Sequence, residues 1–134
     1  MGTNDGTIVA VSSAVGFSAR VVVRLSGARA HAIGRALCPA WEPAAGRASR
    51  EWVEFDGLRF GAWVYAFLSP RSYTGEDSLE LHLPGNEVLA RMVLDRVVEL
   101  GGRHAEPGEF TARAYFNGRM DLTEAEGVAA ILRY

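Results

Sequence analysis

Two residues of opposite charge lie on the polar faces of otherwise apolar segments. Residues 20–27 read RVVVRLSG and residues 78–83 read SLELHL. Alternate side chains of a strand point to opposite faces, so Arg24 and Glu80 are expected opposite the valines and leucines. A carboxylate on such a face can accept paired hydrogen bonds from a ring N–H and an amino group, as on a pterin or guanine edge. A solvated sheet face with a weak ion pair is the alternative.

A second set of polar residues follows the dipeptide Asn117-Gly118, which predicts a turn. Arg119 comes directly after this turn, and Asp121 precedes an apolar stretch with helical spacing. An arginine near the Glu80 carboxylate would hold an anionic or carbonyl group of a ligand. Ordinary helix–turn–helix chemistry, with Asp121 or Thr123 as the N-cap, explains the same residues without a ligand.

Several kinds of chemistry are disfavoured by the residues present. His31, His82 and His104 are scattered without metal-ligand spacing, and no metal site is expected. The single cysteine, Cys38, cannot form an internal disulfide and is expected to be a packed thiol. All 14 basic residues are arginine. Without lysine there is no P-loop of the form G-x-x-x-x-G-K-[ST], so this chain is not expected to hydrolyse GTP or ATP.

Length and charge indicate an ordinary globular domain. The 134 residues suit one hydrophobic core, and the net charge of −2 creates no overall basic field for nucleic acid. No apolar run approaches the roughly 20 residues of a membrane helix, and no signal peptide is recognisable. We therefore expect a cytoplasmic protein that does not contact a membrane.

The order of predicted elements indicates an α+β (mixed α/β) fold, a mixed β-sheet with packed helices. Asp56-Gly57 between two apolar alternations predicts a β-hairpin. In the long helix the expected apolar stripe is Val88, Met92, Val93, Val97 and Leu100. Strands are expected at residues 7–12, 20–27, 51–55, 58–68 and 78–83, and helices at 28–38 and 85–102, from Pro107, and near the C-terminus.

The last predicted helix carries Thr123 and Glu126 at capping-box spacing. It reaches the end of the chain without a stop signal, so we expect the chain to be part of a longer protein.

Four segments together resemble the N-terminal domain of the tRNA modification GTPase family MnmE/TrmE. DGTIVAVSS (5–13) is similar to the family's opening strand, and VVVRLSG (21–27) to its next strand. SYTGEDSLELHLPG (72–85) resembles the family's SFTGEDVLEL segment. EPGEFTARAYFNGRMDLTEAEGVAAIL (106–132) resembles its RPGEFTxRAFLNGKLDL segment. The combination is specific and covers nearly the whole chain.

The resemblance implies a folate-binding and dimerisation domain over residues 1–119, with residues 120–134 beginning the helical domain that follows. It implies 5-formyl-tetrahydrofolate or a related reduced folate as one-carbon donor, and a fold like the folate domain of aminomethyltransferases. It also implies a homodimer. In the longer family members a GTPase domain binds GTP with Mg and K, and the flavoprotein MnmG (GidA) is the partner in modifying the wobble uridine of certain tRNAs.

By match to the family motifs, the folate contacts fall on Arg24, Glu80 and Arg119. Residues 15–19 and 83–86 replace glycine-rich stretches of the family pattern. Side chains there would keep the backbone from the ligand, which predicts folate binding weaker by about one to two decades, or ~1.4–2.8 kcal/mol. Alternatively, Phe17 stacks on the ligand and restores affinity.

Two other functions are considered beside this one. A structural dimerisation domain that has lost folate binding fits the same motifs with the altered loops. A fragment of an aminomethyltransferase-like enzyme would need the rest of a longer fold than 134 residues provide. Folate titration separates the first from the folate-binding hypothesis, and the length of the full protein separates the second.

Overall fold

A six-stranded mixed sheet forms the centre of the chain in a computed structural model, which describes residues 6–13, 20–43 and 47–132. The strands lie in the order β3-β4-β5-β2-β1-β6 and are antiparallel except for the β1–β6 pair. The predicted α+β class is confirmed. The strands are β1 (Thr7–Ser13), β2 (Val21–Ser26), β3 (Ala48–Phe55), β4 (Leu58–Phe67), β5 (Ser78–Leu83) and β6 (Gly102–His104).

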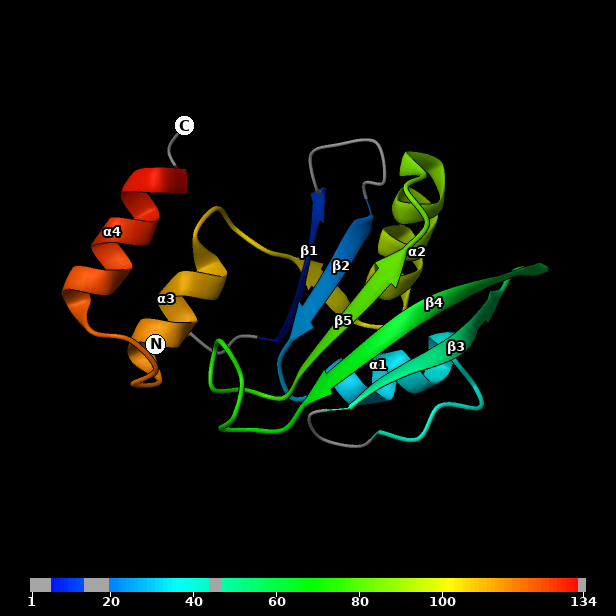
Figure 1. Cartoon of the computed structure of the whole chain (residues 1–134), viewed down its shortest axis with the longest axis horizontal. Coiled ribbons are helices and arrows are strands. Elements are labelled where there is room, and N and C mark those ends of the chain that lie inside the picture. The colour runs from blue at the N-terminus through cyan, green and yellow to red at the C-terminus, as the bar shows by residue number, and fades with distance from the viewer. Residues whose placement is uncertain (1–5, 14–19, 44–46, 133–134) are drawn as a thin grey trace.

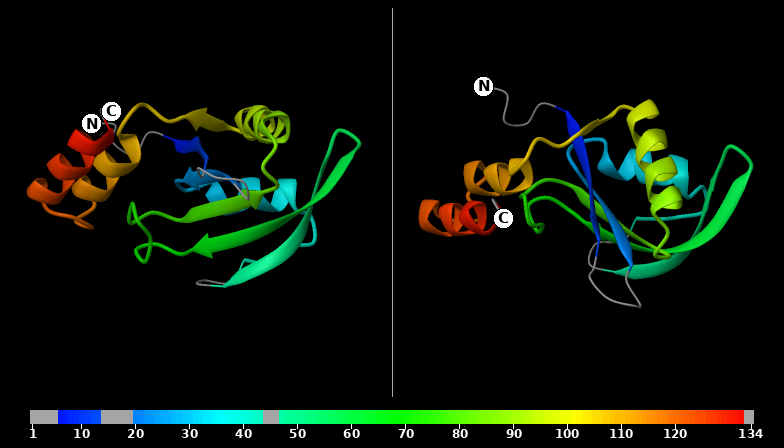
Figure 2. Two further views of the ribbon diagram at one scale, coloured as in Figure 1. Left: turned by 45° about the horizontal axis from the view of Figure 1, so that its top comes forward. Right: turned by 90° about the horizontal axis from the view of Figure 1, so that it is seen from above.

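Within the described ranges, four helices accompany the sheet. They are α1 (Ala30–Leu37), α2 (Glu87–Glu99), α3 (Glu109–Phe116) and α4 (Leu122–Leu132). Helices α1 and α2 lie together on one side of the sheet, whereas α3 and α4 stand beyond one end of it (Figures 1 and 2). Among the described elements, no helix covers most of the opposite side of the sheet (Figures 1 and 2), so side chains there are open to a ligand or partner.

The core lies between the sheet and helices α1 and α2. The alternation predicted for β5 is confirmed, because Leu79, Leu81 and Leu83 are buried while the residues between them are only partly covered. Their neighbours on the same face come from β2 and β4, and the side chains that oppose this face come from the two helices. These core residues include Val23, Leu25, Val64, Ile33, Leu37, Val93 and Val97. The even-numbered residues of β2 and β5 therefore face the open side.

The predicted hairpin is also confirmed. Asp56 and Gly57 join β3 to β4 with positive φ angles of 48° and 78°. Positive φ at both central residues is the geometry of a type I′ turn, whose twist matches that of the strands. Strand β3 begins earlier than expected, at Ala48 instead of Glu51.

The predicted apolar stripe of α2 is wrong at two positions. Val88 is 67% exposed and Met92 is 36% exposed, whereas Ala90, Val93 and Val97 are buried. The spacing of these three residues places them on one helical face. The small side chain of Ala90 lets this face approach the sheet, and this turns Val88 and Met92 outward.

Two features near the C-terminal half also differ from expectation. Strand β6 was not predicted, because its three residues are too few to show alternation; it pairs in parallel with β1. The capping box at α4 is formed by Asp121 and Glu124, and not by Thr123 and Glu126. The Glu124 backbone N–H donates to Asp121 Oδ1 at 2.8 Å, and the Asp121 N–H donates to Glu124 Oε1 at 2.9 Å.

None of the helices within the described residues is long and apolar enough to cross a membrane.

The cap of α2 gives a test of local stability. Asn86 Oδ1 accepts hydrogen bonds from the backbone N–H groups of Val88 and Leu89 at 2.9 and 3.1 Å. We expect Asn86→Ala to lower the free energy of unfolding in urea by about 0.5–2 kcal/mol, because two helix N–H groups lose their acceptor. Arg91→Ala on the exposed side of the same helix is the control, with a change within about 0.5 kcal/mol. Equal losses in both variants would contradict this role for Asn86.

Candidate functional site

Arg24 and Glu80 are directly opposed on the open side of the sheet. The β2–β5 register pairs the two residues, and Arg24 Nε lies 3.3 Å from Glu80 Oε2. The other carboxylate oxygen, Oε1, accepts a hydrogen bond from His82 Nε2 at 3.0 Å. The His82 ring in turn packs against Tyr65 at a centroid distance of 4.5 Å. The Glu80 side chain is therefore held from both sides and is 27% exposed.

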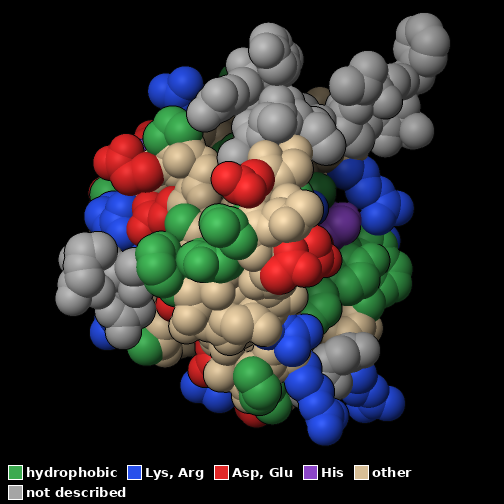
Figure 3. All heavy atoms as spheres, turned by 90° about the vertical axis from the view of Figure 1, so that its left-hand side faces the viewer, with side chains coloured by type: hydrophobic (Ala, Val, Ile, Leu, Met, Phe, Trp, Pro, Cys, Tyr) green, Lys and Arg blue, Asp and Glu red, His purple; other side chains and the backbone are tan. Residues whose placement is uncertain are grey.

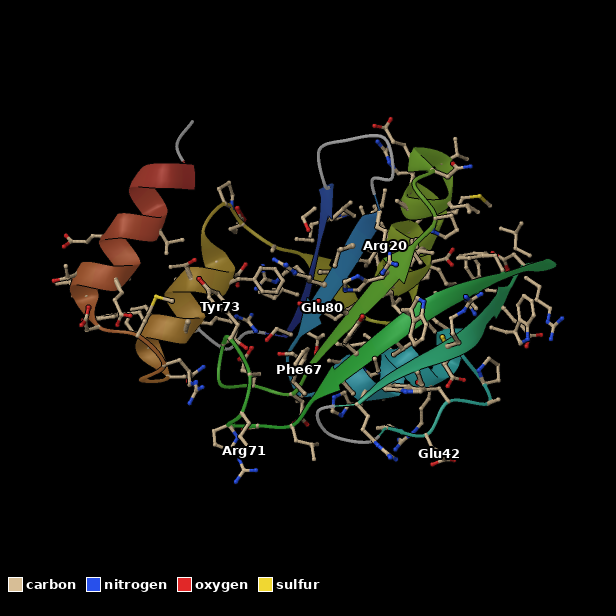
Figure 4. The ribbon with its side chains drawn as sticks, in the orientation of Figure 1. Arg20, Glu42, Phe67, Arg71, Tyr73 and Glu80 are labelled. Carbon is tan, nitrogen blue, oxygen red and sulfur yellow. The ribbon has the colours of Figure 1, made fainter. Side chains whose placement is uncertain are left out.

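A cavity of about 1000 Å³ lies over this pair. Its floor is the open side of β1, β2 and β5, and its walls are the β4–β5 loop and the segment that leads into α3. This volume is at the upper end of the range of roughly 300–1000 Å³ that is typical of small-molecule sites. Figure 4 shows Glu80 on the sheet and Tyr73 on the loop beside α3. The cavity therefore lies between the sheet and the end of the molecule that α3 and α4 form.

All three predicted site residues line this cavity. Arg24 and Glu80 reach it from neighbouring strands, and Arg119 reaches it from the turn between α3 and α4. Arg119 Nε donates to the carbonyl oxygen of Ser72 at 3.1 Å. The structure thus brings together residues that are far apart in the sequence, with two arginines and a glutamate around one space.

Three aromatic side chains also line the cavity. Phe67 ends β4, Tyr73 lies on the β4–β5 loop, and Phe110 begins α3. The Tyr73 hydroxyl is hydrogen-bonded to Thr111 Oγ1 at 2.9 Å, which ties the loop to α3. Flat aromatic walls beside a carboxylate suit a planar heterocycle that also carries hydrogen-bond donors.

A buried arginine fastens α3 to the loop and thereby sets the shape of the cavity. The Arg113 side chain is 1% exposed, and its Nη1 donates to Glu76 Oε1 and to the Gly6 carbonyl oxygen, each at 3.0 Å. Its Nη2 donates to Glu109 Oε2 at 3.1 Å. We call Arg113, Glu76 and Glu109 the buried ion cluster.

Neighbouring polar groups donate further hydrogen bonds to the two carboxylates of the buried ion cluster. Glu76 Oε1 also accepts from Ser26 Oγ at 2.7 Å, which links the loop to β2. Glu109 accepts from Arg103 Nη1 and Nη2 at 2.9 and 2.6 Å. These hydrogen bonds lower the pKa of Glu109 from 4.5 to about 2, with the Arg103 contact as the largest cause. Each buried charge therefore has an opposite charge beside it, as burial requires.

Gly75 allows the loop to approach the α3–α4 turn. Its φ is 85°, and a Cβ atom there would lie 3.0 Å from Asn117 Cβ and 3.2 Å from Arg119 Cγ. Asn117 Nδ2 donates to the Thr74 carbonyl oxygen at 2.8 Å, so the close approach is also hydrogen-bonded. A side chain at position 75 would push Arg119 away from the cavity.

The altered loops do not both bear on the cavity. Residues 15–19, including Phe17, lie outside the described residues. Residues 83–86 do not contribute to the cavity lining described here, and Asn86 instead caps α2. Strand β5 leads residues 83–86 away from the end of the sheet where the cavity lies, and the expected effect of this turn on folate binding stays a prediction.

Cys38 is fully buried, as expected for a packed thiol. Burial raises its pKa to about 12, with smaller contributions from Glu51 and Glu54. The thiolate that a nucleophile or a metal ligand requires is thus disfavoured.

The sequence-based prediction missed the buried ion cluster and the aromatic walls. Glu109 and Arg113 are four residues apart on a helix, and this spacing is a recognisable ion-pair signal. Nothing in the sequence pairs Arg113 with Glu76, because that contact depends on how the loop folds over α3.

The face of α3 and α4 is shown in Figure 3, where hydrophobic side chains lie among acidic and basic ones.

The sequence matches one known protein family over most of its length. Residues 7–119 match the family described as GTP-binding protein TrmE N-terminus. The tRNA modification GTPase MnmE of Caulobacter vibrioides is 45% identical over 127 residues, which are 94% of this chain and 28% of that protein. MnmE of Gluconacetobacter diazotrophicus is 42% identical over 137 residues, and MnmE of Neisseria gonorrhoeae is 39% identical over 133 residues. Each covers 98% of this chain, which spans 32% and 30% of those proteins, respectively.

The fold and the cavity together define an α+β domain with a cavity between its sheet and its C-terminal helices. More specifically, the chain belongs to the MnmE/TrmE family and corresponds to its N-terminal domain. It spans less than a third of the length of these relatives.

The buried ion cluster predicts a specific dependence of stability on pH. The pKa of Glu109 is lowered in the folded state, so the unfolded chain takes up a proton first as the pH falls below 4.5. The stabilising contribution of Glu109 is complete above pH 4.5 and is lost between pH 4.5 and about 2. We expect Glu109→Gln to be less stable than the wild type at pH 7 and to lose less stability on acidification. The measurement is urea unfolding at several pH values.

Glu99→Gln provides the control, because Glu99 is an exposed residue of α2 whose side chain is 62% accessible. We expect its stability to follow the wild-type pH profile. A Glu109→Gln profile parallel to that of the wild type would contradict the role assigned to Glu109.

Proposed function

We propose that this chain binds a reduced folate, 5-formyl-tetrahydrofolate or a close relative, in the cavity over Arg24 and Glu80. The observation that carries the proposal is the convergence of Arg24, Glu80 and Arg119 on one cavity of about 1000 Å³. These residues match the contact positions that the family motifs indicate, and they reach the cavity from three separate elements.

Glu80 is suited to the pterin edge of such a ligand. A carboxylate accepts two parallel hydrogen bonds from a ring N–H and an adjacent amino group. Arg24 Nε and His82 Nε2 each engage one oxygen of this carboxylate, at 3.3 and 3.0 Å. Each carboxylate oxygen can accept more than one hydrogen bond, so both contacts can orient Glu80 while it binds the ligand.

The other walls would hold the rest of the ligand. Phe67, Tyr73 and Phe110 offer aromatic surface to the flat ring systems of a folate. Arg119 supplies a positive charge, which suits an acidic group of the ligand.

A structural dimerisation domain without folate binding is the second candidate. The observation that favours it is the engagement of both Glu80 oxygens by neighbouring side chains. In that case Arg24 and His82 only neutralise the charge of Glu80 on the sheet surface, and the cavity does not bind a folate.

We also propose that the chain forms a homodimer through the open side of the β3–β4 hairpin. Trp52 is 51% exposed there, and Trp63 and Tyr65 lie on the same side of the sheet. Phe60, by contrast, packs against the core. Exposed aromatic residues on one continuous sheet surface are typical of protein interfaces.

In the complete protein we propose that this domain serves modification of the wobble uridine in certain tRNAs. One-carbon transfer from the folate, the flavoprotein MnmG as partner, and GTP hydrolysis by a separate domain belong to this proposal. The name tRNA modification GTPase of the relatives supports it. A tRNA substrate would place the protein in the cytoplasm.

The folate proposal predicts a large effect of Glu80. Glu80→Ala should weaken binding of 5-formyl-tetrahydrofolate by at least ~1–3 kcal/mol in calorimetric titration, because the ligand's paired donors lose their acceptor. Glu54→Ala is the matched control: Glu54 lies on the same side of the sheet and is paired with Arg59 at 4.0 Å, but it is outside the cavity lining. Its affinity should equal that of the wild type. Absence of binding heat from a well-folded wild-type chain would exclude folate binding and favour the structural alternative.

The dimer proposal predicts self-association that depends on the hairpin. We expect sedimentation velocity to show a dimer at micromolar concentration, and Trp52→Ser to weaken it by about tenfold or more, as for a central interface aromatic. Val88→Ser on α2 is the control, since Val88 is also exposed, at 67%, but lies on the helical side of the sheet. A wild-type monomer at high micromolar concentration would contradict the dimer.

A further inference from the structure

Two arginines of the cavity lining have no carboxylate partner within the part of the chain that the structure describes. Arg71 lies on the β4–β5 loop and Arg119 on the α3–α4 turn, and both line the cavity. Among residues 6–13, 20–43 and 47–132, no carboxylate lies within ion-pair distance of either guanidinium. The Nε of Arg119 is occupied by the Ser72 carbonyl oxygen, which orients the guanidinium and leaves its other nitrogens for a further acceptor.

The other charged groups around the cavity differ from this pair. Arg24 is paired with Glu80, and Glu109 is paired with Arg103 and Arg113. Glu106 is the remaining acidic residue of the lining within the described residues, and it lies on the segment before α3. Positive charge without internal compensation is thus concentrated where the β4–β5 loop meets the α3–α4 turn.

The strand register places this charge at a distance from Glu80. Glu80 is opposite Tyr65, and the last pair of the two strands is Phe67 with Ser78. Two residues of a strand span about 7 Å, so Glu80 lies that far inside the end of the sheet. Arg71 follows beyond this end, and in Figure 4 its side chain points away from the ribbon. A long ligand held by Glu80 and passing Phe67 would therefore reach Arg71 with its far end.

We propose that Arg71 and Arg119 form an anion subsite that binds the glutamate tail of the folate, and that the site prefers polyglutamylated reduced folates to the monoglutamate. This inference rests on the folate-binding function proposed above. Each added glutamate brings one more carboxylate, and the planar guanidinium binds carboxylates through paired hydrogen bonds. An exposed arginine suits the flexible glutamate tail, which stays partly in solvent while the pterin of the folate is enclosed.

The test compares the monoglutamate and the pentaglutamate of 5-formyl-tetrahydrofolate by calorimetric titration of the folded 134-residue chain. For the wild type we expect the pentaglutamate to bind more tightly. Exposed ion pairs are worth up to about 1 kcal/mol each, so Arg71→Gln should reduce this preference by about threefold to fivefold. The preference should also shrink at high salt, because ions screen exposed charges.

Arg91→Gln is the control, since Arg91 is an exposed arginine of α2 that does not line the cavity. It should retain the wild-type preference. Equal affinity of the wild type for the two ligands, or an unchanged preference in Arg71→Gln, overturns the tail subsite while leaving folate binding intact. Equal loss of the preference in both variants also overturns it, because the effect would then be one of overall charge. If neither ligand binds the wild type, the folate proposal itself fails, and the tail subsite fails with it.

Discussion

The site depends on the burial of one guanidinium. A buried charge without partners costs several kcal/mol, so Arg113 can be enclosed only where Glu76, Glu109 and the Gly6 carbonyl oxygen meet it. These groups belong to a loop, a helix and the segment before β1. The ion pairs and hydrogen bonds of Arg113 therefore bring together three parts of the chain that the main hydrophobic core does not hold in place. The cavity is the space that remains between them and the sheet.

Much of the sheet could be predicted from the sequence, because alternation is a local property. The apolar residues of 78–83 lie on one face and Glu80 on the other whatever the neighbouring strand is, and Asp56-Gly57 specifies its turn by backbone conformation alone. The prediction that Arg24 and Glu80 share a face needed only the period of two in each strand. That they are directly opposed depends on the register, which the sequence did not define.

The remaining features follow from tertiary contacts. The orientation of α2 depends on how closely Ala90 can approach the sheet, so Val88 and Met92 are exposed although they fit an apolar stripe. Strand β6 exists because its three residues pair with β1, and so short a segment has no periodicity of its own. The contact between Arg113 and Glu76 joins residues 37 positions apart, and no local pattern connects them.

The motifs and the proposed ligand contacts have different physical roles. Glu76 of the TGED turn binds Arg113 of the PGEFTARA segment, and Arg113 also binds Glu109 of its own helix. Beside this pair, the Thr74 carbonyl oxygen accepts a hydrogen bond from Asn117, and Gly75 leaves room for that approach. These contacts hold the helical end against the sheet. Arg24 and Glu80, by contrast, line the cavity itself. The segments that contain them carry fewer unusual residues. The strongest sequence signals therefore identify the scaffold of the site, and they would persist in a chain that had lost its ligand. Whether the chain binds a folate depends on the weaker signals, the charged residues that interrupt two apolar strands.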